Sequence, residues 1–187
     1  MSPEAIAGSI GTATFVVVVI IIYNRLVRLR YAVRSSWADI DVHLRKRYEL
    51  VPNLVETVQA YTTHERETLT RVTEMRSAAM QARTPSAKAR AEGVLTETIH
   101  SLLVLVEAYP TLKADAHFHD LMKQLRELED AIEYARRYYN ANVRDYNIAI
   151  GVFPSNIVAG TFGFAEEEFF ALSADSKARE APAVAFR

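Results

Sequence analysis

The sequence predicts an all-α protein in which an N-terminal transmembrane helix precedes an elongated up-down bundle of long antiparallel helices. The first observation is an uncharged apolar run over residues 5–23, near the start of the 187-residue chain. The second is a set of apolar ladders with a 3.5-residue period beyond Trp37, which is typical of long bundle helices. The third is that no segment alternates apolar and polar residues between turn signals, as the strands of a sheet do.

The apolar run predicts a membrane anchor. At about 1.5 Å per residue, a helix over residues 5–23 spans close to the hydrocarbon core of a bilayer, which is about 30 Å thick. Four arginines follow it directly, namely Arg25, Arg28, Arg30 and Arg34. Because positive charge favours the cytoplasmic side, we expect a cell-membrane protein that crosses the bilayer once. Residues 1–4 would lie outside and the C-terminal domain in the cytoplasm.

An uncharged apolar run near the start of a chain has two other interpretations. A cleaved signal peptide carries positive charge before its apolar run and small residues at a cleavage site after it. Residues 1–4 contain no Lys or Arg, and the run ends in Tyr23-Asn24-Arg25, so the charge asymmetry is the reverse of an export signal. A buried core helix of a soluble protein remains the alternative to an anchor.

Composition excludes several classes of site. The chain has no cysteine, which rules out disulfides, thiolate catalysis and Cys-based zinc sites. Its formal net charge is -1, so no strong basic field points to nucleic acid, and we expect no nucleic-acid partner.

The ladder that starts at Trp37 predicts one long helix. Its two lines are Trp37, Leu44, Val51, Val58, Glu65, Val72, Ala79 and Ile40, Arg47, Leu54, Tyr61, Thr68, Met75. Pro52 lies inside this helix and should kink it near Tyr48, because proline removes one backbone hydrogen bond and clashes with the preceding turn. A break of the helix at this point is the alternative.

Three further helices follow. Thr84-Pro85 predicts a helix start, with Thr84 as N-cap, and Tyr109-Pro110 ends that helix. The next helix, over about 115–152, carries the clearest ladder, and Phe153-Pro154 stops it before a short helix from Ser155. Its two core lines are Phe118, Leu125, Ile132, Tyr139, Tyr146, Phe153 and Leu121, Leu128, Ala135, Asn142, Ala149. The bundle is expected to cover residues 24–172, with a flexible tail over 173–187.

The segment from Trp37 to Val55 resembles the LemA family of bacterial membrane proteins. Matching residues beyond it are Tyr61, His64-Glu65, Glu107, Tyr109-Pro110, Leu112-Lys113-Ala114, Arg136, Tyr139-Asn140, Tyr146-Asn147, Phe153-Pro154, Phe162-Gly163-Phe164, Phe169-Phe170, Pro182, Val184 and Phe186. The resemblance implies a single N-terminal anchor and a long helical bundle in the cytoplasm. It implies no particular reaction.

Polar residues on or beside the predicted core lines are the candidate site residues: Arg47, Asn53, Glu65, Arg136, Asn140 and Asn147. A charge inside a bundle is costly unless paired, and a polar core residue commonly sets helix register. The favoured interpretation of these residues is therefore a set of structural networks that fix helix register. A groove that binds a partner or a peptide is the second interpretation, and catalysis is the third. The aromatic residues Phe162, Phe164, Phe169 and Phe170 are expected to cap the bundle or to bind a neighbouring protein.

The leading functional hypothesis is a membrane-anchored helical scaffold that is not an enzyme and needs no cofactor. Its partners would be the bilayer, through residues 5–23, an unidentified protein, and a second copy if a heptad face is only partly used. One alternative is a metal-dependent enzyme that uses Glu97 and His100 with a neighbouring carboxylate, Glu107 or Glu129. Another is a rod-shaped device that remodels membranes.

Overall fold

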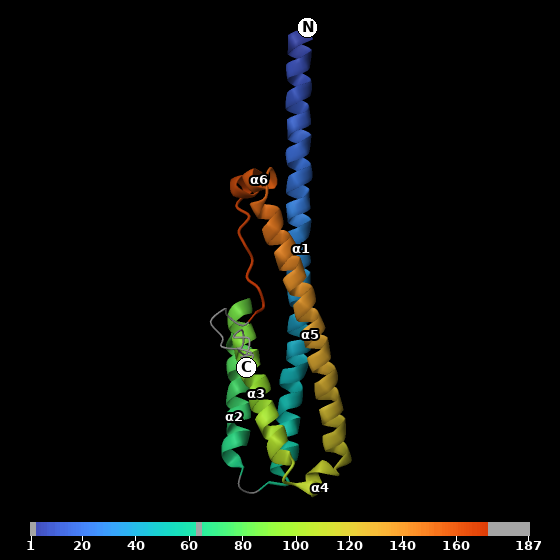
Figure 1. Ribbon diagram of the computed structural model, residues 1–187, viewed down its shortest axis with the longest axis vertical. Coiled ribbons are helices and arrows are strands. Elements are labelled where there is room, and N and C mark those ends of the chain that lie inside the picture. Colours follow the sequence, from blue (N-terminus) through green and yellow to red (C-terminus); the bar gives the residue numbers. More distant parts are fainter. Residues whose placement is uncertain (1–2, 63–64, 172–187) are drawn as a thin grey trace, which may run out of the picture. The chain divides into compact units, whose positions relative to one another are not determined.

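The computed structural model describes residues 3–62 and 65–171, and this part of the chain is all-α (Figure 1). Its helices are α1 (Pro3–Gln59), α2 (Arg66–Gln81), α3 (Pro85–Val106), α4 (Pro110–Lys113), α5 (Ala116–Gly151) and α6 (Ser155–Phe162). No strand occurs among the described residues, so the all-α prediction is confirmed. The expected tail over 173–187 and the family-like residue His64 lie outside the described residues.

The chain divides into two compact units, and α1 and α5 each contribute a segment to both. Of the described residues, 3–40 and 135–167 belong to unit 1, and 41–62, 65–134 and 168–171 belong to unit 2. Each unit is described by itself below.

Local sequence sets most of the helix boundaries. Thr84 is extended and its hydroxyl accepts a hydrogen bond from the Ala87 amide at 3.2 Å, so it is the N-cap of α3, as predicted. Asp115 similarly accepts from the Phe118 amide at 2.8 Å ahead of α5. The predicted helices over 85–109 and 115–152 and the short one from Ser155 are confirmed within a few residues.

The predicted long helix beyond Trp37 is wrong at one point, because α1 ends at Gln59 and α2 begins at Arg66. The Arg76 Nε atom on α2 donates to the Tyr48 carbonyl on α1 at 2.6 Å. One continuous straight helix would separate these residues by about 42 Å, so α2 folds back along α1. One line of the predicted ladder is buried on both sides of the turn, with Val58 and Val72 each 0% exposed, whereas Tyr61 of the second line is 39% exposed.

In unit 1, the C-terminal end of the apolar run packs against the end of α5 and against α6. The buried side chains are Leu26, Ala149, Val158 and Ala159, with Val19, Ile22, Leu29, Ile150 and Phe164 partly buried around them. Phe153, placed on a core line by the ladder, is instead 78% exposed, because α5 ends at Gly151 and the helical period no longer directs its side chain.

α1 is the one helix in the described part of the chain that is long and apolar enough to cross a membrane. Its apolar window has a mean hydropathy of 1.8, and 6% of that window is buried within the protein. Most side chains of this window are therefore not buried within the protein. The alternative of a buried core helix is hard to reconcile with this exposure.

Candidate functional site

The main polar site of unit 2 is centred on Arg47 of α1, whose side chain is 1% exposed. Its Nη1 atom donates to Oε2 of Glu92 on α3 at 3.0 Å. Its Nη2 atom donates to the Thr96 hydroxyl on α3 at 2.9 Å and lies 2.7 Å from Oε1 of Glu129 on α5. One guanidinium therefore joins three helices, through the planar fork of donors that arginine offers to carboxylates.

Glu92 is the buried anion of this site, at 5% exposure. Its second oxygen, Oε1, accepts a hydrogen bond from the Tyr48 hydroxyl. Burial raises the pKa of Glu92, while the Tyr48 hydrogen bond and the charge of Arg47 act in the opposite direction. Burial and the contact with Glu92 raise the pKa of Tyr48, which keeps its hydroxyl protonated as a donor.

Pro52 explains a second contact of the site. Because proline has no amide hydrogen, the carbonyl of Tyr48, four residues earlier, lacks its usual helical donor. Arg76 supplies that donor from α2 at 2.6 Å. α1 is one helix across Pro52, and a contact between helices takes the place of the helical hydrogen bond that proline removes.

Lys88 closes the turn between α2 and α3. It is 6% exposed, and its ammonium donates to the Ala79 carbonyl in the last turn of α2 at 3.0 Å. Its Nζ atom also lies 5.6 Å from the ring centroid of Tyr48. A cation at a helix C-terminus satisfies an open carbonyl and the negative end of the helix dipole.

The remaining candidate polar residues are described in turn. Glu65 meets the Tyr109 hydroxyl at 3.4 Å, whereas Asn53 is exposed. In unit 1, the Asn147 side chain donates to the Glu167 carbonyl and accepts from the Glu167 amide, each at 3.0 Å. This pairing attaches the segment after α6 to α5. Two further candidates on α5 are partly buried: Arg136 and Asn140.

The four candidate aromatic residues are divided between the units. In unit 1, the Tyr23 ring lies 4.9 Å from that of Phe162 and 5.7 Å from that of Phe164, centroid to centroid. In unit 2, Phe170 is 1% exposed and Phe169 is 43% exposed. Phe170 is therefore a core residue, whereas Phe162 contacts the end of the apolar run.

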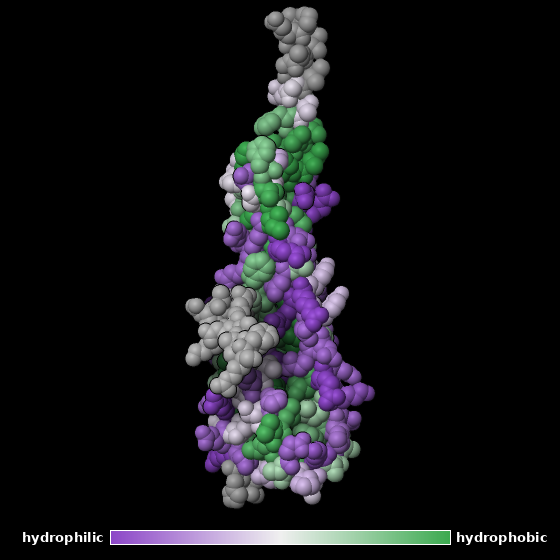
Figure 2. Space-filling model, viewed as in Figure 1, coloured by the Kyte–Doolittle hydropathy of each residue, from purple (hydrophilic) through white to green (hydrophobic). Residues whose placement is uncertain are grey.

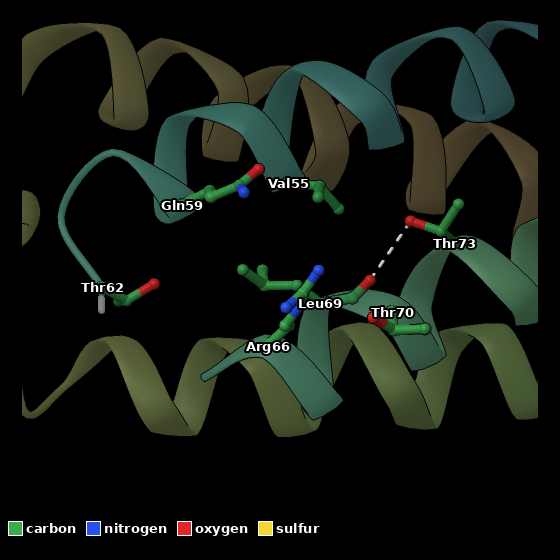
Figure 3. A pocket seen from close by; sticks show the side chains of 7 residues that line it. All are labelled: Val55, Gln59, Thr62, Arg66, Leu69, Thr70 and Thr73. Atoms are coloured by element: carbon green, nitrogen blue, oxygen red, sulfur yellow. Dashed lines mark hydrogen bonds between the residues drawn. The ribbon is translucent and has the colours of Figure 1, made fainter. Parts of the chain in front are cut away.

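A groove of about 430 Å³ lies between α1 and α2 in unit 2 (Figure 3). Its lining is mostly aliphatic and hydroxyl-bearing: Val55, Gln59, Thr62, Arg66, Leu69, Thr70 and Thr73. The Thr73 hydroxyl donates to the Leu69 carbonyl at 3.2 Å, so it is engaged within its own helix. Arg66 is the charged residue of this lining, and no acid–base pair converges on the groove.

The residues of the metal-enzyme alternative are not brought together as a ligand set. Glu97 and His100 are exposed on α3, while Glu107 pairs with Lys113 and Glu129 pairs with Arg47. Within residues 3–62 and 65–171, no group of three or more His, Asp or Glu side chains is arranged to hold a metal ion.

Sequence reasoning found Arg47 but missed the residues that surround it, above all Glu92 and Lys88. A signal was present, because α3 buries Lys88, Glu92, Leu95, Ile99 and Leu102, which follow one another at steps of three and four. The two charged residues therefore continue the apolar stripe of α3.

These features define a class of protein: an all-α chain with one exposed apolar helix of membrane-spanning length and a bundle that contains a buried ion network. The family model of the LemA family matches residues 36–186, and the chain belongs to this family.

Similar proteins were also found by sequence. Magnetosome proteins MamQ 1 and MamQ 2 of Paramagnetospirillum magneticum are each 36% identical over 80 residues. Magnetosome protein MamQ of Magnetospirillum gryphiswaldense is 32% identical over 80 residues. The matched stretch is 43% of this chain and 29% of each relative, so the chain covers less than a third of their length.

Proposed function

We propose that this chain is a membrane-anchored helical scaffold, in which α1 crosses the bilayer and the helical bundle makes non-catalytic contacts with other proteins. One observation supports the proposed membrane anchor: large apolar side chains are exposed along one stretch of α1. They are Phe15, Val16, Val17, Val18, Ile20 and Ile21, between 44% and 68% exposed. A continuous apolar surface of this kind is unfavourable in water and favourable in hydrocarbon.

The direction of insertion follows from charge. The arginines that follow the apolar run would keep their side of the membrane in the cytoplasm, with residues 1–4 outside. A green fluorescent protein fused to the C-terminus should fluoresce, and the fusion should stay in the membrane through alkaline carbonate extraction. The control variant reverses the charge asymmetry: three lysines are added before residue 5, and glutamine replaces Arg25, Arg28, Arg30 and Arg34. This variant should fluoresce less, because the positive-inside rule then favours the opposite orientation. Extraction of the unaltered fusion by carbonate would contradict the anchor.

The scaffold part is supported by how the charged groups of unit 2 are used. Both oxygens of Glu92 accept hydrogen bonds, and Arg47 is bound to groups from two other helices. The charged groups of this network are thus used to hold the helices of unit 2 in one arrangement. Such an arrangement keeps the exposed surface of the bundle in a constant shape, as a scaffold that binds partners requires.

Photo-crosslinking in intact cells tests this role. A photoreactive residue is placed at Val104 or Tyr134, which are 60% and 74% exposed, and a matched one at the buried Leu102. The exposed positions should give reproducible adducts with a second copy or another protein, and the buried position should not. Adducts at neither exposed position, or stoichiometric metal in protein purified without added metal, would contradict a non-catalytic scaffold.

A further inference from the structure

α6 packs directly on the end of the proposed membrane span. Its Val158 and Ala159 are buried against Leu26, while Val19 and Ile22 of the apolar run border the same core cluster. The core of unit 1 therefore includes side chains that an anchor would place in hydrocarbon. Figure 1 shows α6 beside α1 within this unit.

The segment that contains α6 also carries no charge. Residues 146–165 contain no Asp, Glu, Lys, Arg or His, and the flanking residues are Asp145 and Glu166. Large apolar side chains of the segment are exposed, with Phe153 at 78%, Ile157 at 61% and Phe162 at 54%. Figure 2 shows hydrophobic residues gathered over α6 and the adjoining part of α1.

We infer that α6 and the residues before it form a second membrane contact, which lies in the boundary between headgroups and acyl chains beside the cytoplasmic end of the apolar run. This inference rests on the proposed membrane anchor. Lipid is favoured over another occupant because α6 adjoins the apolar run: side chains of both belong to one core cluster. A bilayer that surrounds Val19 and Ile22 must also meet the side chains packed beside them.

The depth is consistent with an interfacial helix. Val19 lies about 6 Å along the helix axis from Tyr23, where the apolar run ends. Helices that lie in the membrane interface bury their apolar face by about 5–10 Å. The Tyr23 ring contacts Phe162, which places two aromatic rings at the level where aromatic residues are enriched in membrane proteins.

Arg30 marks the boundary between the proposed membrane contact and the polar surface of unit 1. Its guanidinium lies 6.0 Å from the ring centroid of Phe164, and its Nε atom lies 3.8 Å from a carboxylate oxygen of Glu167. The ion pair follows directly after the uncharged segment and suits the hydrated headgroup layer. The segment thus has an apolar part for the acyl boundary and a charged border for water.

The experiment measures depth in the full-length chain reconstituted into phosphatidylcholine–phosphatidylglycerol vesicles. Because the chain has no cysteine, single cysteines can be introduced at chosen positions and labelled with an environment-sensitive fluorophore. The test positions are Phe153 and Ile157, with Val18 as the anchor reference and Tyr134, which is 74% exposed in unit 2, as the aqueous reference. Quenching by nitroxide-bearing lipid is compared with quenching by aqueous iodide.

At the test positions we expect quenching by the nitroxide lipid close to that at Val18, and little quenching by iodide. Iodide quenching at the level of Tyr134, with Val18 still in lipid, would overturn the inference and leave the anchor intact. Iodide quenching at Val18 as well would refute the anchor itself. If neither quencher reaches the test positions, a protein surface covers them and the inference is wrong.

Discussion

Replacing Arg47 by methionine removes the central charge of the unit 2 network while keeping a long side chain in the core. Arg47 is 1% exposed and Glu92 is 5% exposed, so the variant leaves the Glu92 carboxylate buried without its cationic partner. Of the hydrogen bonds described above for this carboxylate, the one from the Tyr48 hydroxyl remains. Removing one partner of a buried ion pair typically costs about 3–5 kcal/mol of unfolding free energy. We expect the Arg47→Met variant to lose stability by this amount.

The assay is urea unfolding of the full-length chain in a mild detergent, followed by circular dichroism at 222 nm. For a slope of about 2 kcal/mol per molar urea, a loss of about 4 kcal/mol lowers the midpoint by about 2 M. The matched control is Arg45→Met on the same helix. Arg45 lies 2.6 Å from Asp41, but its side chain is 73% exposed, so that variant should lose about 0.3–0.5 kcal/mol.

A double variant separates the lost charge pair from lost packing. Adding Glu92→Leu to Arg47→Met removes the unpaired anion, so the double variant should be less destabilised than the sum of the single variants by about 0.5–3 kcal/mol. Two results would refute the reasoning: an Arg47→Met variant no less stable than Arg45→Met, or single-variant losses that simply add.

Three further predictions concern charge, segment attachment and capping. Because burial raises the pKa of Glu92 above its ordinary 4.5, the folded state holds this proton more tightly than the unfolded state. The wild type should therefore lose stability relative to Glu92→Gln as the pH rises from below 4.5 through the folded-state pKa; a pH-independent difference in unfolding free energy would contradict this. Asn147→Ala removes two hydrogen bonds to the Glu167 backbone, so hydrogen exchange at the Glu167 amide should accelerate as a local stabilisation of about 1–3 kcal/mol is lost, while exchange within α3 stays unchanged. Thr84→Ala leaves the Ala87 amide without its cap and should cost about 1 kcal/mol in urea unfolding, whereas Thr84→Ser, which keeps the hydroxyl, should cost much less.

The connection between α1 and α2 could not be predicted from the heptad pattern of the sequence. Val58 and Val72 belong to one heptad line in the sequence, and both are fully buried. A heptad line reports that a helical face is covered, but not whether the chain has reversed direction between two members of the line. For this reason, the predicted single helix places Val58 and Val72 correctly in the core but has the wrong connection, and Tyr61, which it also placed on a core line, is 39% exposed.

The candidate site was predictable to a similar extent. Arg47 stood out because a charged residue occupied an apolar line, and the need for a partner on another helix followed from the cost of burying a charge. Glu92, which meets it, lies 45 residues further along the chain. Nothing in the spacing of the two residues specifies that they face each other.

The sequence by itself determined the helical class, the N-cap at Thr84, the extent of α5 and the apolar run of α1, because each depends on residues within a few turns of one another. Only the tertiary structure decided that α2 folds back onto α1, that Arg76 meets the carbonyl freed by Pro52, and that α6 packs beside Ile22. The physical reason is that these contacts join residues far apart in sequence. Helical periodicity shows that a face is buried, whereas packing alone selects the side chains that cover it.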